Sequence, residues 1–207
     1  MSAAPTQGGL TQALGLMNDD DLKSHKNAML AGGYNLDSPD FQRLKQWHGV
    51  IFQLTSAKYY LNALMLREPI LGDLEDVYKA MALLSSFILQ YSKCFTSGGQ
   101  RQVTLDANKV FTPGGDDLKS HHRILEIRHN LIAHNGNSDL VLANIGMKEQ
   151  EDRFVVKHFL TFALPMDELS EFEAALDIAT KYSVKAINKH LDSIGERLGK
   201  IVLLDEA

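Results

Sequence analysis

Four long stretches of this 207-residue chain repeat apolar residues every three or four positions, and this spacing constrains the fold more than any other feature. Such a period places the apolar side chains on one face of a helix, which must be buried against another element. Helix-start signals precede three of the stretches: Ser38-Pro39, Asp116 or Asp117, and Pro165. The expected helices cover about 39–67, 72–95, 116–135 and 166–198. We expect these helices to pack as an antiparallel helical bundle.

The period changes between the third and fourth stretches. Apolar residues gather at 140–142 and 154–162, on either side of a charged segment at 148–153. Two apolar runs around a polar turn are typical of a β-hairpin, which we place at about 139–164. The expected fold class is therefore all-α, with about four long helices and a β-hairpin inserted after the third.

The remaining segments indicate the domain organisation. Residues 1–38 are rich in small and polar residues and predict a flexible N-terminal arm, with a brief helix around Leu10 to Met17 that Asp19, Asp20 and Asp21 interrupt. Residues 39–200 are expected to form one helical domain. Within it, residues 96–115 contain two Gly-Gly pairs and predict a long loop with one helical turn near 105–110.

Composition excludes several classes of protein. A formal net charge of -5 argues against a general nucleic-acid coating protein, so any RNA binding must be local. Cys94 is the single cysteine, which excludes an intramolecular disulfide and favours a reducing, cytoplasmic setting. Because no stretch approaches the roughly 18 apolar residues of a membrane span and no secretory leader is recognisable, we expect no membrane association.

The third stretch contains the sequence ILEIRHNLIAHN at 124–135, with Arg128 among apolar residues of the same helix side. Burying an unpaired guanidinium costs several kcal/mol, so Arg128 must be paired, face a wet cleft or serve a function that needs a fixed positive charge. His134 follows six positions later, at the edge of the same stripe. The two form a candidate phosphate-handling pair. The alternative is an arginine that extends to solvent and a histidine placed to suit the helix dipole.

The segment R128-H129-N130-L131-I132-A133-H134 resembles the signature of the HEPN superfamily, the higher-eukaryote and prokaryote nucleotide-binding domain. In that family an arginine is followed by a usually polar residue and, after a short spacer, by a histidine. The resemblance extends loosely to the helical frame at about 38–198. It implies a metal-independent endoribonuclease without a cofactor, in which a ribose 2′-hydroxyl attacks the adjacent phosphate. Arg128 would then hold the phosphate, His134 would transfer protons, and His129 and Asn130 would orient the site.

The same resemblance implies partners. HEPN proteins typically form homodimers whose two motifs face one another, so we expect a homodimer, RNA as substrate, and a toxin or phage-defence role with a possible antitoxin protein. Some members are instead controlled by modification of a tyrosine two residues after the motif histidine. Gly136 occupies that position here, which argues against this control. The alternative function is a catalytically inactive HEPN-like dimeric module that binds a nucleotide, RNA or a protein partner.

Three other groups of residues invite a functional interpretation. His122, Glu126 and His129 have the helical spacing of a metal site and adjoin His121, but they fall on the side expected to face solvent, so no metal is expected. The cations Lys93, Arg101 and Lys109, with Tyr91 and Phe95, could bind single-stranded RNA, although core packing of the two rings is favoured. Cys94 is expected to be a buried apolar residue rather than a nucleophile.

Overall fold

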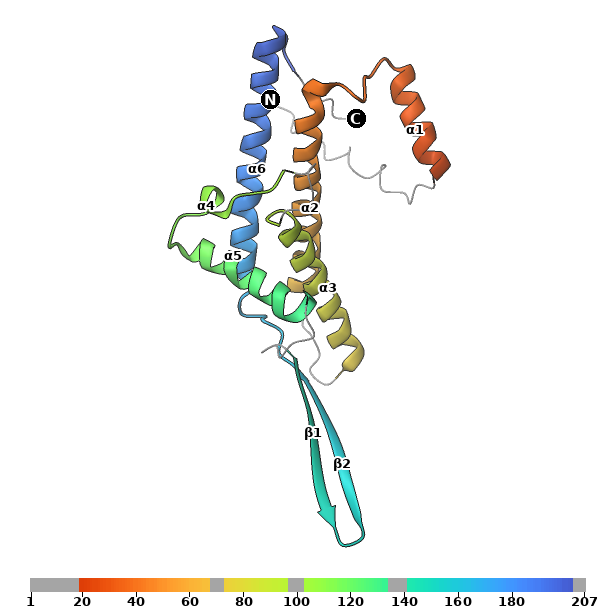
Figure 1. Ribbon diagram of the computed structural model, residues 1–207, viewed down its shortest axis with the longest axis vertical. Coiled ribbons are helices and arrows are strands. Elements are labelled where there is room, and N and C mark those ends of the chain that lie inside the picture. Colours follow the sequence, from red (N-terminus) through yellow and green to blue (C-terminus); the bar gives the residue numbers. More distant parts are fainter. Residues whose placement is uncertain (1–18, 68–72, 97–102, 134–140, 203–207) are drawn as a thin grey trace, which may run out of the picture. The chain divides into compact units, whose positions relative to one another are not determined.

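The computed structural model describes residues 19–67, 73–96, 103–133 and 141–202. Within these ranges the protein is mainly helical, with one small antiparallel hairpin (Figure 1). The chain divides into two compact units. One is formed by the residues up to Arg43 together with those from Lys189 onward, and the other by Leu44–Asn188. The second unit contains the residues of the sequence motif that the structure describes.

The first unit begins with α1, Asp19–Ala31, which has no buried residue. The expectation that Asp19, Asp20 and Asp21 interrupt a helix is wrong, because these three residues form the first turn of α1. Carboxylates at this end are favourable, since the backbone N–H groups there carry partial positive charge. The helix expected around Leu10 to Met17 lies outside the described residues. A 3₁₀ turn, η1 (Pro39–Phe41), then leads into the next helix.

Four further helices follow close to the expected positions: α2 (Gln42–Met65), α3 (Leu74–Lys93), the short α4 (Ala107–Val110) and α6 (Leu169–Leu198). Two of them have aspartate caps. Asp73 accepts hydrogen bonds from the backbone N–H groups of Glu75 and Asp76 at the start of α3, and Asp106 accepts one from Asn108 at the start of α4. Such caps satisfy backbone donors that have no partner within the helix and so fix where each helix begins.

The third expected helix is shorter than predicted. α5 covers Asp116–Ile127 and is followed by η2, a π-helical turn over Arg128–Ala133. The sequence predicts one regular α-helix over this whole segment. Its apolar spacing fits an α-helix as well as a widened turn, so a change of period inside the motif could not be seen from the sequence.

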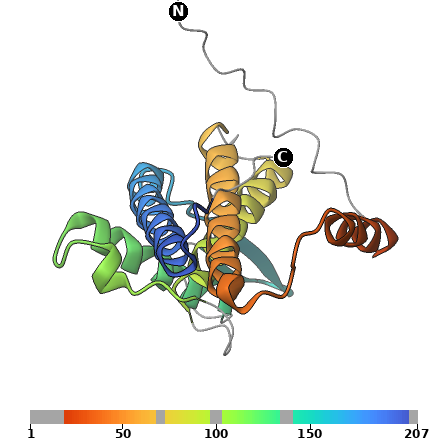
Figure 2. The same cartoon turned by 90° about the horizontal axis from the view of Figure 1, so that it is seen from above.

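The core of the second unit lies between α2, α3, α5 and α6, and α2, α3 and α6 lie side by side in both views (Figures 1 and 2). Its fully buried side chains come from all four helices: Leu54, Leu61, Leu64, Leu84, Phe87, Ile88, Ile124, Phe172 and Leu176. The rings of Phe87 and Phe172 stack with centroids 6.1 Å apart and join α3 to α6. Burial of this apolar surface is the main force that stabilises the arrangement.

One ion-pair group also connects α2 to α6. Lys58 Nζ lies 2.7 Å from Glu173 Oε1 and 2.9 Å from Asp177 Oδ1. Burial alone would lower the pKa of Lys58, but the hydrogen bonds and the charges of the two carboxylates outweigh it and raise that pKa. The lysine therefore stays charged and forms ion pairs that link α2 to α6.

The hairpin consists of β1 (Val141–Gln150) and β2 (Arg153–Phe162), paired antiparallel from Val141 opposite Phe162 to Gln150 opposite Arg153. The prediction of a hairpin here is confirmed, with a narrower turn than expected. Only Glu151 and Asp152 connect the strands, so the rest of the charged segment at 148–153 belongs to the strands themselves. In the part of the chain that the structure describes, no helix has the length and apolar character needed to cross a bilayer.

Replacing Leu61 by Ala should lower the free energy of unfolding by about 3 kcal/mol, because Leu61 is fully buried and its truncation leaves a cavity in the core. Leu22→Ala in α1 is the matched control, since Leu22 is 61% exposed, and it should change stability by less than about 0.5 kcal/mol. Urea unfolding followed by circular dichroism measures both. Equal effects of the two substitutions would contradict this description of the core.

Candidate functional site

The sequence motif begins where α5 changes into the π-helical turn η2. The N–H of Arg128 is shared between the carbonyls of Ile124 and Leu125, and from Arg128 onward the helix widens. A π-helical turn has poorer packing than an α-helix and occurs often at functional sites. Ile124 and Ile127 are buried just before it. The core therefore fixes the position of the last turn of α5, from which η2 begins.

Arg128 is half-buried at the start of η2. Of the three possibilities raised by the sequence, pairing is not observed, because no carboxylate in the described ranges forms a recorded ion pair with Arg128. The side chain is neither enclosed in the apolar core nor fully solvated. A partly exposed guanidinium without a neutralising carboxylate among the described residues remains able to bind an anion.

The structure describes two of the other three motif residues, His129 and Asn130. His129 is exposed, and Asn130 is half-buried, one and two positions after Arg128. His134 lies outside the described residues. The structure therefore places Arg128, His129 and Asn130 on one π-helical turn and leaves the pairing with His134 as a prediction.

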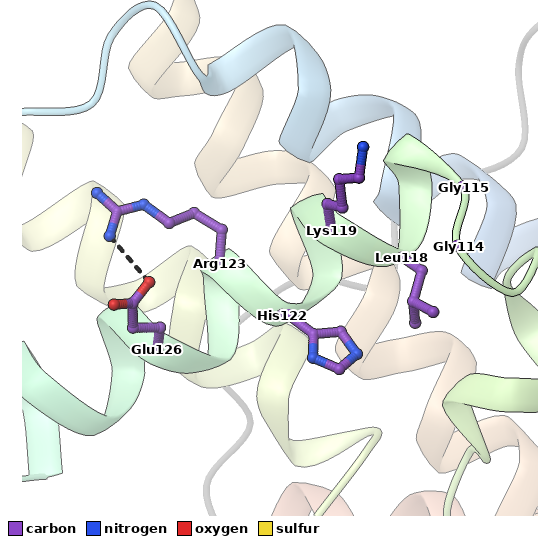
Figure 3. Close-up of a pocket in the computed structure, with 7 residues that line it drawn as sticks. All are labelled: Gly114, Gly115, Leu118, Lys119, His122, Arg123 and Glu126. Carbon is purple, nitrogen blue, oxygen red and sulfur yellow. Dashed lines mark hydrogen bonds and ion pairs between the residues drawn. The ribbon is translucent and has the colours of Figure 1, made fainter.

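A pocket of about 650 Å³ lies along the N-terminal half of α5 (Figure 3). Seven residues line it: Gly114, Gly115, Leu118, Lys119, His122, Arg123 and Glu126. Arg128 is not among them. Gly114 has φ 75°, a left-handed conformation that glycine adopts without strain, and it turns the chain into the start of α5.

The cations of this pocket are already neutralised. Arg123 donates to both carboxylate oxygens of Glu168 at 3.0 and 3.2 Å and to Glu126 at 3.1 Å. Lys119 lies 2.8 Å from Asp116, and this hydrogen bond raises the pKa of Lys119 and lowers that of Asp116. Figure 3 also shows that Lys119 and His122 point away from each other. The pocket therefore lacks converging positive charges for a phosphate.

The metal alternative receives no geometric support from the described part of the chain. No three His, Cys, Asp or Glu side chains there are grouped so that they could hold a metal ion. His122 and His129 are both exposed, as is Glu126, whose carboxylate binds Arg123. This agrees with the view of that side of α5 as a solvated face.

Three buried rings, those of Tyr91, Phe111 and His121, form an aromatic cluster with the half-buried Phe95. The hydroxyl of Tyr91 is 2.9 Å from His121 Nδ1, and it donates when the ring proton is on Nε2. His121 is only 2% exposed. Burial, and secondarily the charge of the neighbouring His122, lower the pKa of His121 to about 4. Burial raises the pKa of Tyr91, so both groups are neutral near pH 7.

The contacts of this cluster distinguish RNA binding from core packing as the role of the Tyr91 and Phe95 rings. Tyr91 is fully buried and Phe95 packs on His121 with ring centroids 4.3 Å apart, so these rings serve core packing. The expectation that Cys94 is buried is confirmed, and burial raises the pKa of its thiol to about 12. A thiol with that pKa is not a nucleophile at neutral pH. The sequence does not predict the Tyr91–His121 contact, because the two residues are 30 positions apart and no spacing pattern connects them.

Comparison with protein-family models, with curated proteins and with solved structures finds no match to this chain.

Stability should depend on pH through His121. The unfolded chain takes up the histidine proton near pH 6.5, whereas the folded protein does so only near pH 4. Between these values the unfolded state binds more protons, so stability is complete above about pH 6.5 and is lost as the pH falls towards 4, by roughly 2–3 kcal/mol. Urea unfolding at several pH values measures this slope. His121→Gln should remove it and His122→Ala should keep it; an unchanged slope in His121→Gln would contradict the assignment.

The two arginines of this helix should respond differently to replacement. Arg123→Met should destabilise the protein by about 1–2 kcal/mol, because it removes the hydrogen bonds to Glu168 and Glu126. Arg128→Met should change stability by less than about 0.5 kcal/mol, since no recorded ion pair in the described ranges is lost. Urea unfolding at pH 7 compares them. A loss in Arg128→Met as large as that in Arg123→Met would indicate a structural role for Arg128.

Proposed function

We propose that this chain is a metal-independent endoribonuclease of HEPN type, with Arg128 as its phosphate-binding residue. The proposal depends on the overlap of the motif with η2. The π-helical turn begins at the motif arginine. That arginine is partly exposed and forms no ion pair with a carboxylate of the described ranges. Arg123, five positions earlier, is held by two carboxylates. The contrast supports a binding role for Arg128 and a structural role for Arg123.

The proposed reaction is an internal transfer at one phosphate of the RNA. The ribose 2′-oxygen forms a bond to phosphorus, the bond to the 5′-oxygen of the next nucleotide breaks, and the products are a 2′,3′-cyclic phosphate and a 5′-hydroxyl. Arg128 offsets the negative charge on the phosphate oxygens. His134 takes the proton of the 2′-hydroxyl, and the 5′-oxygen receives a proton from His134 of a second copy. His129 and Asn130 orient the phosphate.

A homodimer supplies that second copy. The helices would form an antiparallel bundle of HEPN type, and the two motifs would face one another across a two-fold axis in a shared cleft. Such a cleft accounts for the half-buried position of Arg128 without a carboxylate partner. The cellular role proposed for this activity is that of a toxin or phage-defence effector in the cytoplasm, with an antitoxin protein as a possible partner.

The second candidate is a catalytically inactive HEPN-like dimeric module that binds a nucleotide, RNA or a protein. One observation favours it. The net charge of -5 opposes RNA binding over a broad surface. The assay below separates the two candidates.

Purified protein incubated with RNA in the presence of a chelator should produce fragments that end in a 2′,3′-cyclic phosphate, detected by mass spectrometry. Arg128→Ala and His134→Ala should each reduce the rate by about 100-fold or more, since each removes a group that acts in the transition state.

His122→Ala is the control, because His122 is an exposed histidine of α5 that lies outside the motif, and this variant should cleave at the wild-type rate. Cleavage that persists in both motif variants would overturn the proposal. A protein that binds RNA or a nucleotide but yields no fragments would establish the second candidate instead.

A further inference from the structure

The hairpin has one apolar face that nothing in the described chain covers. Side chains alternate between the two faces of a strand, and residues paired across an antiparallel ladder share a face. Met147 pairs with Val156, Ile145 with His158, and Glu149 with Phe154. The apolar members of this face are strongly exposed: Ile145 69%, Met147 68%, Phe154 58% and Val156 52%. The opposite face carries Lys148 and Lys157. An isolated two-stranded ribbon is marginally stable in water, so this face needs a partner.

Helix α2 carries a second uncovered apolar surface. Phe52, Tyr59 and Leu66 recur every seven residues, which places them along one side of the helix and at its end. They are exposed to 69%, 70% and 87%. Lys45, a further seven positions earlier, is also exposed and extends the same line towards the N-terminal end of α2. We call the three apolar residues the α2 stripe.

The sizes of the two surfaces indicate what covers them. From typical side-chain areas, the hairpin face and the α2 stripe each expose on the order of 300 Å² of apolar surface. Either surface alone is too small for a stable protein interface, which needs at least about 600 Å² on each partner. If each copy contributes both surfaces, the contact reaches that lower limit. This arithmetic favours a reciprocal contact between two copies of the same chain.

We propose that the hairpin of one copy lies on the α2 stripe of a second copy, and that the second copy returns the same contact. This arrangement is closed and two-fold symmetric. Opposite charges set the direction in which the hairpin lies on the helix. Glu149 lies at the turn end of the apolar hairpin face, and Lys45 and His48 are exposed at the N-terminal end of the stripe. The hairpin turn therefore points towards the N-terminal end of the partner helix. The lengths agree as well, since ten strand residues and the span from Lys45 to Leu66 both measure roughly 30 Å.

Val155 and Val156 offer a matched pair of variants, because they are neighbours on β2 with similar exposure, 43% and 52%, on opposite faces of the ribbon. The full-length protein should sediment at twice the monomer mass of 23.0 kDa. Val156→Lys should raise the dimer dissociation constant by about tenfold or more, and Val155→Lys should leave it unchanged. Tyr59→Lys should weaken the dimer like Val156→Lys. A monomeric wild-type protein, or equal behaviour of the two valine variants, would overturn the proposal.

Disulfide trapping tests which surfaces meet, with little background because the native Cys94 is buried. A mixture of Met147→Cys and Tyr59→Cys chains should form a mixed disulfide, whereas Lys148→Cys, on the opposite hairpin face, should not pair with Tyr59→Cys. Disulfides between two Met147→Cys chains without any mixed product would contradict the hairpin-on-helix contact. The interface and the nuclease are tested separately: a Val156→Lys variant that is monomeric and still cleaves RNA would support this interface and refute the shared cleft.

Discussion

The packing of α5 against α3 is the constraint on which the candidate site depends. His121 of α5 contributes a buried imidazole that shares a hydrogen bond with the Tyr91 hydroxyl of α3 inside a cluster of rings. Such a contact is favourable only while both groups are neutral, because a buried charge without a partner is costly. Since α5 leads directly into η2, the packing of α5 fixes the backbone position from which the π-helical turn begins.

The middle of α5 and its C-terminal end differ in their charges. Within the helix, Lys119 and Arg123 are bound by carboxylates, so these cations are neutralised by the chain itself. At the C-terminal end, η2 begins at Arg128, one residue after the buried Ile127, and the Arg128 N–H is shared between the carbonyls of Ile124 and Leu125. The Arg128 side chain is half-buried there. This is an arrangement in which a fixed positive charge is available for a ligand, and it links the local backbone geometry to the proposed chemistry.

Much of the fold could be predicted from the sequence, because periodicity reports which faces are buried. The positions of α2, α3 and α6 and the existence of the hairpin followed from spacing and from Pro and Gly signals. The helix α1 was missed, since its acidic first turn looked like an interruption and no residue of it is buried. The π-helical turn and the Tyr91–His121 contact could not be predicted. The first changes the period within a few residues, and the second depends on how two helices pack.

The proposed nuclease requires that Arg128, and not Arg123 five positions earlier, binds a phosphate of RNA. This requirement can be tested by nuclear magnetic resonance of the arginine Nε–H groups during titration with an oligonucleotide. The oligonucleotide carries a 2′-deoxy residue at each position, so it cannot be cleaved. Assignment follows from the loss of one signal in Arg128→Lys and of another in Arg123→Lys. With added oligonucleotide, the Arg128 signal should shift while the Arg123 signal stays in place. A shift of Arg123 alone, or of neither arginine, would contradict it.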